Sequence, residues 1–125
     1  MRTAEEIQQL AEKFWVDEAF ADDASLRTYN HIIILEAHKL CQAWDLDGLE
    51  DWLALFRHAE PRCREEPLLT RYEHGLLLIT LSIASTHSAM GSFDTAYLLA
   101  EQILDLLRLQ DDRRAKLGLM ELGNS

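Results

Sequence analysis

The sequence has little of what strands, long loops and disulfide scaffolds require. It contains a single valine, two prolines and five glycines in 125 residues, while leucine is plentiful. Leucine and alanine favour helices, whereas strands are enriched in valine and other β-branched residues. The composition therefore predicts an all-α protein. The two cysteines, Cys41 and Cys63, have no CxxC spacing and predict reduced thiols without a metal.

Long apolar runs are also missing. No stretch approaches the roughly 18 consecutive residues that are needed to span a bilayer. The first residues, Met1 to Glu6, are acidic and amphipathic, whereas a signal peptide begins with basic and then apolar residues. We therefore expect a cytoplasmic protein that does not insert into membranes.

Basic residues are scarce relative to acidic ones. Twelve Lys and Arg side chains stand against 22 Asp and Glu, which gives a formal net charge of −10 at pH 7. Proteins bind a phosphate backbone by displacing its counterions with Lys and Arg, so direct nucleic-acid binding is not expected. The charge would suit a partner protein with a basic surface, although the simpler interpretation is that it only keeps the chain soluble.

Length and composition predict one helical domain over residues 1–125. Apolar residues make up 48% of the chain and charged residues 27%, which is unlike the composition of disordered chains. A chain of this length can bury most of the surface that it exposes when unfolded. Gly118, Gly123 and the polar end of the sequence predict a frayed tail over residues 118–125.

Apolar residues recur at spacings of three and four, the period of amphipathic helices. Thr3 and Glu6 have the spacing of a capping box, and Asp23 or Ser25 is the expected N-cap of the second helix. Pro67 fits the first turn of the fourth helix, which is the most apolar and is expected to be central. The predicted helices span residues 4–20, 25–44, 46–59, 68–90 and 93–109, followed by a short, weak helix over 113–122.

The two halves of the chain share one pattern of small and bulky residues. The pattern becomes visible when the sequence is aligned with itself at an offset of 47 residues. It aligns Ala37, Trp44, Leu46, Leu49, Leu53 and Phe56 with Ala84, Gly91, Phe93, Ala96, Ala100 and Ile103. Small residues at these positions let two antiparallel helices pack closely around a tight turn. The pattern predicts a duplicated helical hairpin with sharp corners at Trp44 and Gly91.

This spacing resembles the helix-turn-helix of tetratricopeptide repeats, over about residues 30–61 and 77–109. Pro61 falls where that repeat places its closing proline, whereas the offset exceeds the family's ~34-residue repeat and Trp44 stands where Gly is common. The resemblance implies an antiparallel bundle of five to six helices, built from stacked hairpins whose concave face holds a segment of another protein. A plain five-helix bundle would produce similar spacings and stays an alternative.

The expected function is therefore protein binding without catalysis or cofactor, as an adaptor, a secretion-chaperone-like protein or a regulatory inhibitor. Aromatic side chains commonly anchor such interfaces, and an aromatic at a turn or between polar residues is expected to be exposed. The predicted partner-binding residues combine three such aromatics with acidic residues that begin the third helix: Trp44, Tyr72, Tyr97, Asp47, Glu50 and Asp51. A homodimer through the apolar fourth or fifth helix is a further expectation.

Two other function classes stay open. One is an inhibitor that mimics nucleic acid with its carboxylates. The other is a small helical metal-dependent hydrolase whose site is built from His38, His74 and His87 with nearby carboxylates. No HExxH or comparable ligand motif accompanies these histidines, so ordinary surface or half-buried histidines are the competing interpretation.

Overall fold

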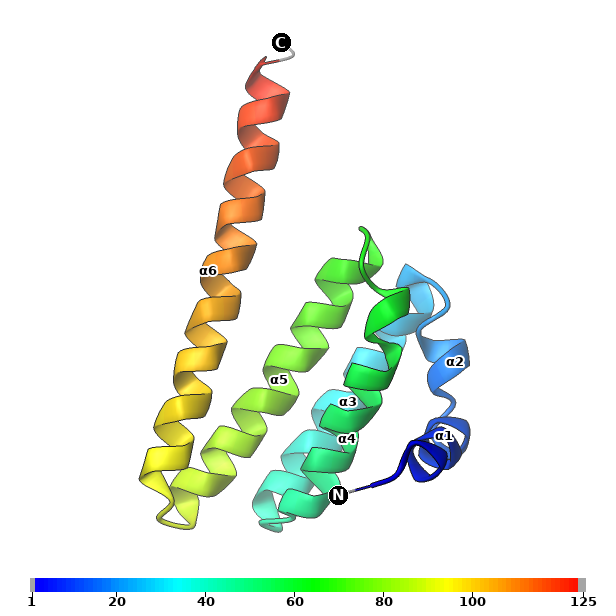
Figure 1. Cartoon of the computed structure of the whole chain (residues 1–125), viewed down its shortest axis with the longest axis vertical. Helices are drawn as coiled ribbons and strands as arrows, with labels where there is room; N and C mark the ends of the chain where they lie inside the picture. The colour runs from blue at the N-terminus through cyan, green and yellow to red at the C-terminus, as the bar shows by residue number, and fades with distance from the viewer. Residues whose placement is uncertain (1, 124–125) are drawn as a thin grey trace.

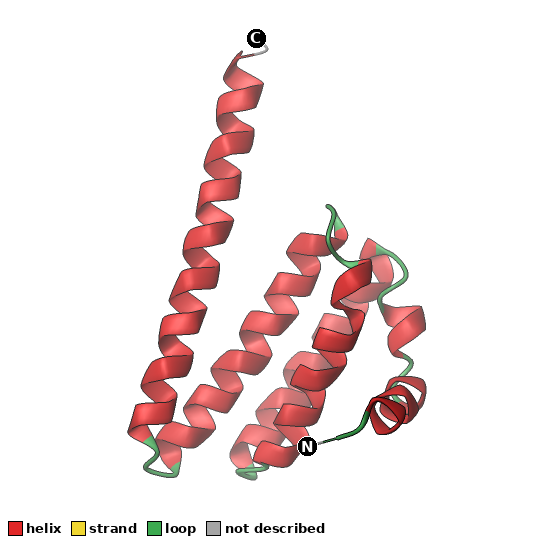
Figure 2. Cartoon of the chain, in the orientation of Figure 1, coloured by secondary structure: helices red, strands yellow, loops and turns green. Residues whose placement is uncertain are grey.

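A computed structural model describes the backbone of residues 2–123 and the side chains of residues 2–117. This part of the chain is all-α and contains no strand (Figures 1 and 2), which confirms the predicted fold class. The elements in chain order are α1 (Ala4–Lys13), α2 (Val16–Ala19), α3 (Asp23–Gln42), α4 (Leu46–Ala59), a 3₁₀ turn η1 (Glu60–Arg62), α5 (Leu68–Ala89) and α6 (Phe93–Gly123). The frayed tail predicted for residues 118–125 concerns positions whose side chains lie outside the described residues, and it stays a prediction.

Helix α5 is the centre of the bundle, as its apolar sequence predicted. It packs against α3, α4 and α6, whereas α6 packs mainly on α5. The four long helices run up and down along one axis, and the α3–α4 and α5–α6 turns lie at the same end (Figure 1). Helices α1 and α2 cover the other side of the α3–α4 hairpin. The architecture is a stack of helical hairpins flanked by a short N-terminal pair.

The core is built around a chain of aromatic rings from α3, α4 and α5 and from the C-cap residues of α1 and α2. Phe20 lies at its centre, edge-on to Phe56 with the ring centroids 5.2 Å apart. Tyr72 of α5 packs on Phe56 at 5.5 Å, and Trp52 of α4 packs on Phe14 at 4.9 Å. Offset and edge-on ring pairs stabilise a core beyond the area that they bury. These contacts hold the N-terminal helices, α3, α4 and α5 together.

Gly75 allows α5 to approach Phe56 directly. A Cβ atom at this position would lie 2.5 Å from Phe56 Cζ and 2.8 Å from Asn30 Oδ1. Both neighbours are constrained, because the Phe56 ring is fully buried and the Asn30 side chain donates a hydrogen bond to the Arg71 carbonyl. Only glycine permits this spacing, although the residue stands in the middle of a helix.

The predicted first helix is interrupted, which corrects the span of residues 4–20. Trp15 has a left-handed backbone with φ 53° and separates α1 from α2. The Tyr29 hydroxyl donates a 2.6 Å hydrogen bond to the Phe14 carbonyl, so this carbonyl bonds outside its own helix. At this break the Trp15 side chain is 68% exposed. A core contact from α3 thus outweighs the local preference for helix.

The helix starts are largely as predicted. Thr3 and Glu6 form the capping box, since each side chain bonds the backbone N–H of the other. Asp45 caps α4 by accepting a hydrogen bond from the Gly48 amide at 2.9 Å. The second predicted helix begins earlier, because Asp22 is the N-cap in place of Asp23 or Ser25. Its hydrogen bond from the Ser25 amide lowers the pKa of Asp22.

The chain after residue 109 continues as one helix, which corrects the predicted break at Asp111–Asp112. Glu73 is buried on α5 and accepts hydrogen bonds from Gln110 and Arg113 of α6. Residues 110 and 113 lie on one helix face only if the helix continues between them. Aspartate costs a helix interior only a few tenths of a kcal/mol to about 0.7 kcal/mol, less than breaking a buried charge pair.

The corners at Trp44 and Gly91 have the same hydrogen bonds at an offset of 47 residues. The amide of Trp44 bonds Cys41 O and that of Asp45 bonds Leu40 O, while Gly91 bonds Ser88 O and Ser92 bonds His87 O. Both corner residues have positive φ, 55° and 86°. These are Schellman motifs, which end many helices in unrelated proteins. The corners therefore match in shape, and membership of the tetratricopeptide family stays a prediction.

The close contact at Gly75 predicts a stability loss. Gly75→Ala should lower the free energy of unfolding by about 1–3 kcal/mol, because the added methyl group overpacks a core that cannot shift freely. Urea denaturation followed by circular dichroism measures this. Gly48→Ala is the matched control, since its methyl group would meet only side-chain atoms that can move, namely the end of Leu40 and the exposed carboxylate of Asp45. Equal losses in the two variants would contradict the proposed role of Gly75.

Candidate functional site: a groove between α1 and α4

Helix α4 separates its residues into a buried face and a face that is open to solvent. Leu49, Trp52, Leu55, Phe56 and Ala59 point into the core. The 3.6-residue period then places a different set on the outer face. These are Asp47, Glu50, Asp51, Ala54, Arg57 and His58, with Leu53 at the edge, and all of them line one groove.

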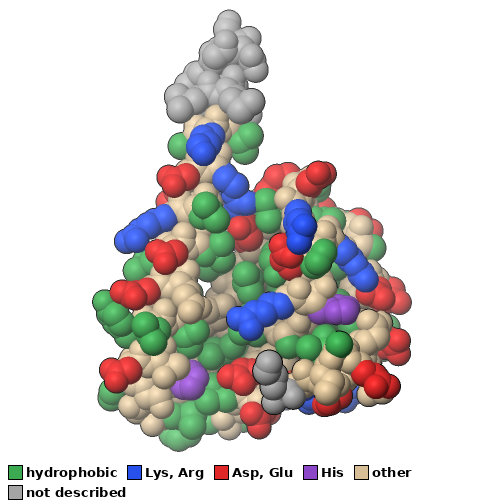
Figure 3. All heavy atoms as spheres, viewed as in Figure 1, with side chains coloured by type: hydrophobic (Ala, Val, Ile, Leu, Met, Phe, Trp, Pro, Cys, Tyr) green, Lys and Arg blue, Asp and Glu red, His purple; other side chains and the backbone are tan. Residues whose placement is uncertain are grey.

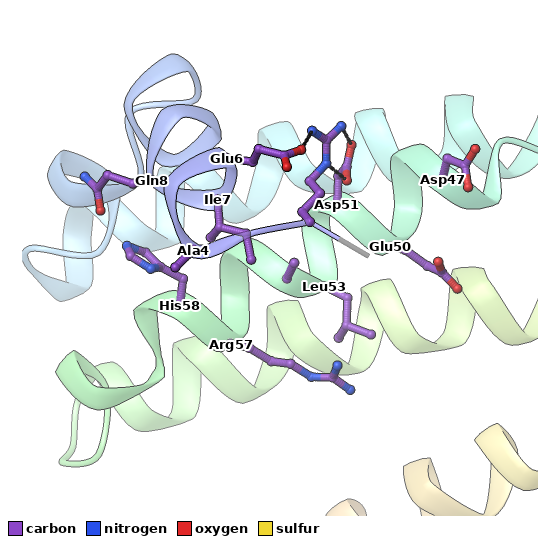
Figure 4. Close-up of a pocket in the computed structure, with 12 residues that line it drawn as sticks. Ala4, Glu6, Ile7, Gln8, Asp47, Glu50, Asp51, Leu53, Arg57 and His58 are labelled. Carbon is purple, nitrogen blue, oxygen red and sulfur yellow. Dashed lines mark hydrogen bonds and ion pairs between the residues drawn. The ribbon is translucent and has the colours of Figure 1, made fainter.

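The start of the chain forms the opposite wall of this groove. The capping box fixes the beginning of α1, and Phe14 at its other end packs on Trp52. The groove has a volume of about 1180 Å³. Its lining from the N-terminal segment consists of Arg2, Ala4, Glu6, Ile7 and Gln8. The arrangement leaves Ile7, Ala4 and Leu53 between the polar side chains (Figure 4).

Arg2 ties the two walls together. Its Nε lies 2.6 Å from Asp51 Oδ1 and its Nη2 lies 2.9 Å from Asp51 Oδ2, which is a bidentate pair. Glu6 Oε2 lies 3.6 Å from Arg2 Nη1. The hydrogen bond with Asp51 raises the pKa of Arg2 above its ordinary value. Asp51 and Glu6 therefore share Arg2, whereas Asp47 and Glu50 have no ion-pair partner among the described residues.

Charge is separated along the groove. Figure 4 shows Asp47 and Glu50 toward the N-terminal end of α4 and His58 toward its C-terminal end, while the side chain of Arg57 extends from that end back toward Leu53. Residues 47 to 58 extend over about 16 Å at the rise of an α-helix. The acids at the beginning of α4 and Arg57 and His58 at its end also suit the helix dipole. The groove therefore offers an apolar floor with an acidic end and a basic end.

The groove brings together half of the partner-binding residues predicted from the sequence. Asp47, Glu50 and Asp51 line it, with Asp51 engaged by Arg2. Trp44 is 55% exposed and Tyr97 is 65% exposed, as expected for surface anchors, but neither lines the groove. Whether any of these residues meets a partner stays a prediction.

The predicted exposure of Tyr72 is wrong. Its side chain is only 5% exposed and packs on Phe56 and Phe20 in the core. The polar neighbours Arg71 and Glu73 are themselves engaged, with Arg71 paired to Asp23 at 3.0 Å and Glu73 held by α6. The polar neighbours of Tyr72 suggested exposure to solvent when only the sequence was considered. In the structure these neighbours form contacts between helices.

Sequence reasoning missed Arg2, Ile7, Arg57 and His58 as part of a site. The signal was present only in part, since Arg57 and His58 follow Asp47, Glu50 and Asp51 on the same helical period. Nothing in the sequence showed that the N-terminal segment would fold back over that face. The groove results from tertiary packing of α1 on α4.

The histidines do not assemble into a metal site. Among the described residues there is no group of three or more His, Cys, Asp or Glu side chains that could hold a metal ion. His38 lies on α3, while His74 and His87 lie on α5. His87 is half-buried, and its Nδ1 has no hydrogen-bond partner in the described structure. Cys41 and Cys63 are free thiols, and burial raises the pKa of Cys63.

Comparison with known proteins adds no family. The chain matches no protein-family model, no curated protein and no solved structure. No helix in the described part of the chain is both long and apolar enough to cross a membrane.

The buried tyrosine predicts an alkaline loss of stability. Burial disfavours the phenolate and raises the pKa of Tyr72 to about 12, above the value of about 10 in an unfolded chain. Between these values the unfolded state releases a proton that the folded state keeps. This stabilising term is complete below about pH 10 and is lost as the pH rises toward 12. Burial also raises the pKa of Tyr29.

Thermal unfolding between pH 9 and pH 12 tests this assignment. The melting temperature should fall as the pH rises past about 10, and Tyr72→Phe should make the fall less steep. Tyr97→Phe, which removes a hydroxyl from an exposed ring, is the control. Identical alkaline slopes in the wild type and in Tyr72→Phe would show that Tyr72 does not titrate with unfolding.

Proposed function

We propose that this protein is a non-enzymatic interaction module and that the α1–α4 groove holds a short segment of a partner protein. The segment carries basic residues where it meets Asp47 and Glu50, apolar residues over Ile7 and Leu53, and acidic residues toward Arg57 and His58. Peptide grooves with apolar floors bind amphipathic segments in this way, and charge sets the orientation of the segment.

The separation of charge along α4 is the observation that carries this proposal. A surface whose charge serves only solubility has no need of an apolar strip between an acidic and a basic end. Here Ala4, Ile7, Leu53 and Ala54 line the same groove as the two charged ends. Arg2 and Asp51 neutralise each other, so their pairing shapes the wall and leaves the ends to select the ligand.

An adaptor, a secretion-chaperone-like protein or a regulatory inhibitor would each use such a groove, and the tetratricopeptide resemblance favours this group of functions. We propose the cytoplasm as the compartment, because the chain keeps two free thiols. The homodimer expected from the apolar helices concerns a different surface, on α6. The nucleic-acid-mimic and hydrolase alternatives receive no comparable support from the groove, because Arg2 and Arg57 line it together with the carboxylates.

Peptide selection tests the proposed groove. Random peptides of about twelve residues, the length of α4 that lines the groove, are displayed and selected on the immobilised protein. The Asp47→Lys, Glu50→Lys variant serves for counter-selection. The enriched peptides should share one order of charge, with basic and acidic ends on either side of apolar residues. Enrichment without this order, or no enrichment at all, would contradict the proposal.

Affinity measurements on a selected peptide complete the test. Asp47→Lys should raise Kd about tenfold, the equivalent of about 1.4 kcal/mol, because it replaces attraction by repulsion at one end of the groove. Asp94→Lys is the matched control, since Asp94 has the corresponding place in the first turn of α6 and lies outside the groove. Equal effects of the two substitutions would indicate non-specific attraction to an acidic protein.

A further inference from the structure

Helix α6 uses one face to pack on α5. The residues along this face recur at spacings of three and four, and each is at least partly buried. They are Ala96, Leu99, Ile103, Leu106, Gln110 and Arg113. Gln110 and Arg113 end the face by binding the buried Glu73 carboxylate. This seam accounts for how α6 is held in the monomer.

A second apolar stripe on α6 has no partner within the described chain. It consists of Phe93, Tyr97, Ala100, Leu104 and Leu107, which repeat the same spacing and are all exposed. Phe93 is 67% exposed and Leu104 is 50% exposed. The stripe begins about 100° around the helix from the seam, because most of its members directly follow a seam residue in sequence. Continuous exposed apolar surface of this kind marks an interaction site.

The length of α6 exceeds what α5 can support. α6 has 31 residues and α5 has 22, and the last turns of α6 extend beyond the rest of the molecule (Figure 1). Figure 3 shows hydrophobic and charged side chains side by side on the surface of α6. Helical turns without tertiary contacts are only marginally stable in water.

Charge along α6 indicates the occupant. From Phe93 to Asp105 the charged residues are Asp94, Glu101 and Asp105, with no Lys or Arg. The next twelve positions contain a different set, namely Arg108, Arg113, Arg114 and Lys116 together with Asp111 and Asp112. An antiparallel second copy would place its basic half beside the acidic half of the first. A parallel copy would oppose like charges.

Glu101 and Arg108 fix the register. They lie seven residues apart on the same edge of the stripe, with Leu104 between them. Among the described residues, Arg108 forms its one ion pair with Asp105, at 3.5 Å, and both side chains are 74% exposed, so this pair contributes little stability. In an antiparallel pair that crosses at Leu104, Glu101 of each copy faces Arg108 of the other.

We propose that two copies of this chain associate through α6, antiparallel, with Leu104 at the twofold axis. Ala100 of each copy packs beside Leu107 of the other, and the small alanine lets the helices approach. The Glu101–Arg108 contact occurs twice, as in any isologous interface. The interface does not involve the α1–α4 groove, so the proposed dimer and the proposed peptide groove can be tested independently.

Sedimentation equilibrium of the full chain tests the pairing. The wild type should be a dimer, and Leu104→Asp should be a monomer, with at least a hundredfold weaker association, because two carboxylates would meet at the axis. Leu98→Asp is the matched control, since Leu98 is equally an exposed leucine of α6 but lies outside the stripe. Circular dichroism checks that both variants keep their helices. A monomeric wild type, or a dimer that survives Leu104→Asp, overturns the proposal.

Charge exchange tests the orientation and register. Glu101→Arg and Arg108→Glu should each weaken the dimer about tenfold, because two attractive contacts become repulsive. The double variant restores opposite charges at both contacts and should recover dimerisation to within about twofold of the wild type. Raising the salt concentration should weaken the wild-type dimer and reduce the difference between the single variants and the wild type. A double variant as weak as the single ones would rule out the antiparallel register.

Discussion

The contact between the Phe56 ring and the bare backbone at Gly75 is the constraint on which the rest of the bundle depends. It brings α5 close to α4 and α3, and the rings of Phe20 and Tyr72 then pack around Phe56. With α5 fixed at the centre, its opposite side is free to hold α6 through Glu73. The position of α4 is fixed by the same contact, so the groove that α4 forms with α1 depends on it as well.

The helices with the clearest apolar period were predictable from the sequence. Residues 46–59 and the start of the helix at Leu68 agree with α4 and α5, because caps and turns bounded them locally. The break at Trp15 and the continuity through Asp111 were not predictable. Each is decided by a side chain distant in sequence, namely Tyr29 for the first and Glu73 for the second. At both places a hydrogen bond between distant parts of the chain outweighs the local helix propensity of the sequence.

The candidate site divides in the same way. Asp47, Glu50 and Asp51 could be selected from the sequence, because acids at a helix start are visible there. The structure adds what the sequence did not show: Arg2, on the segment that packs against α4, neutralises Asp51 and forms part of the groove wall. The predicted exposure of Tyr72 was wrong because polar residues beside a tyrosine can face either solvent or a neighbouring helix. Single residues were readable from the sequence, whereas the concave surface that they form was not.

Two tryptophans stand at positions where the backbone favours glycine. Trp15 and Trp44 both have φ near +55°, and both are largely exposed. A left-handed conformation costs an L-residue about 1–2 kcal/mol, which a glycine in the same corner avoids. Glycine would relieve this backbone cost at either corner, but it would also give up the contacts of the indole and lose more backbone entropy on folding. The chain thus keeps two largely exposed indoles at corners where the backbone conformation opposes any side chain.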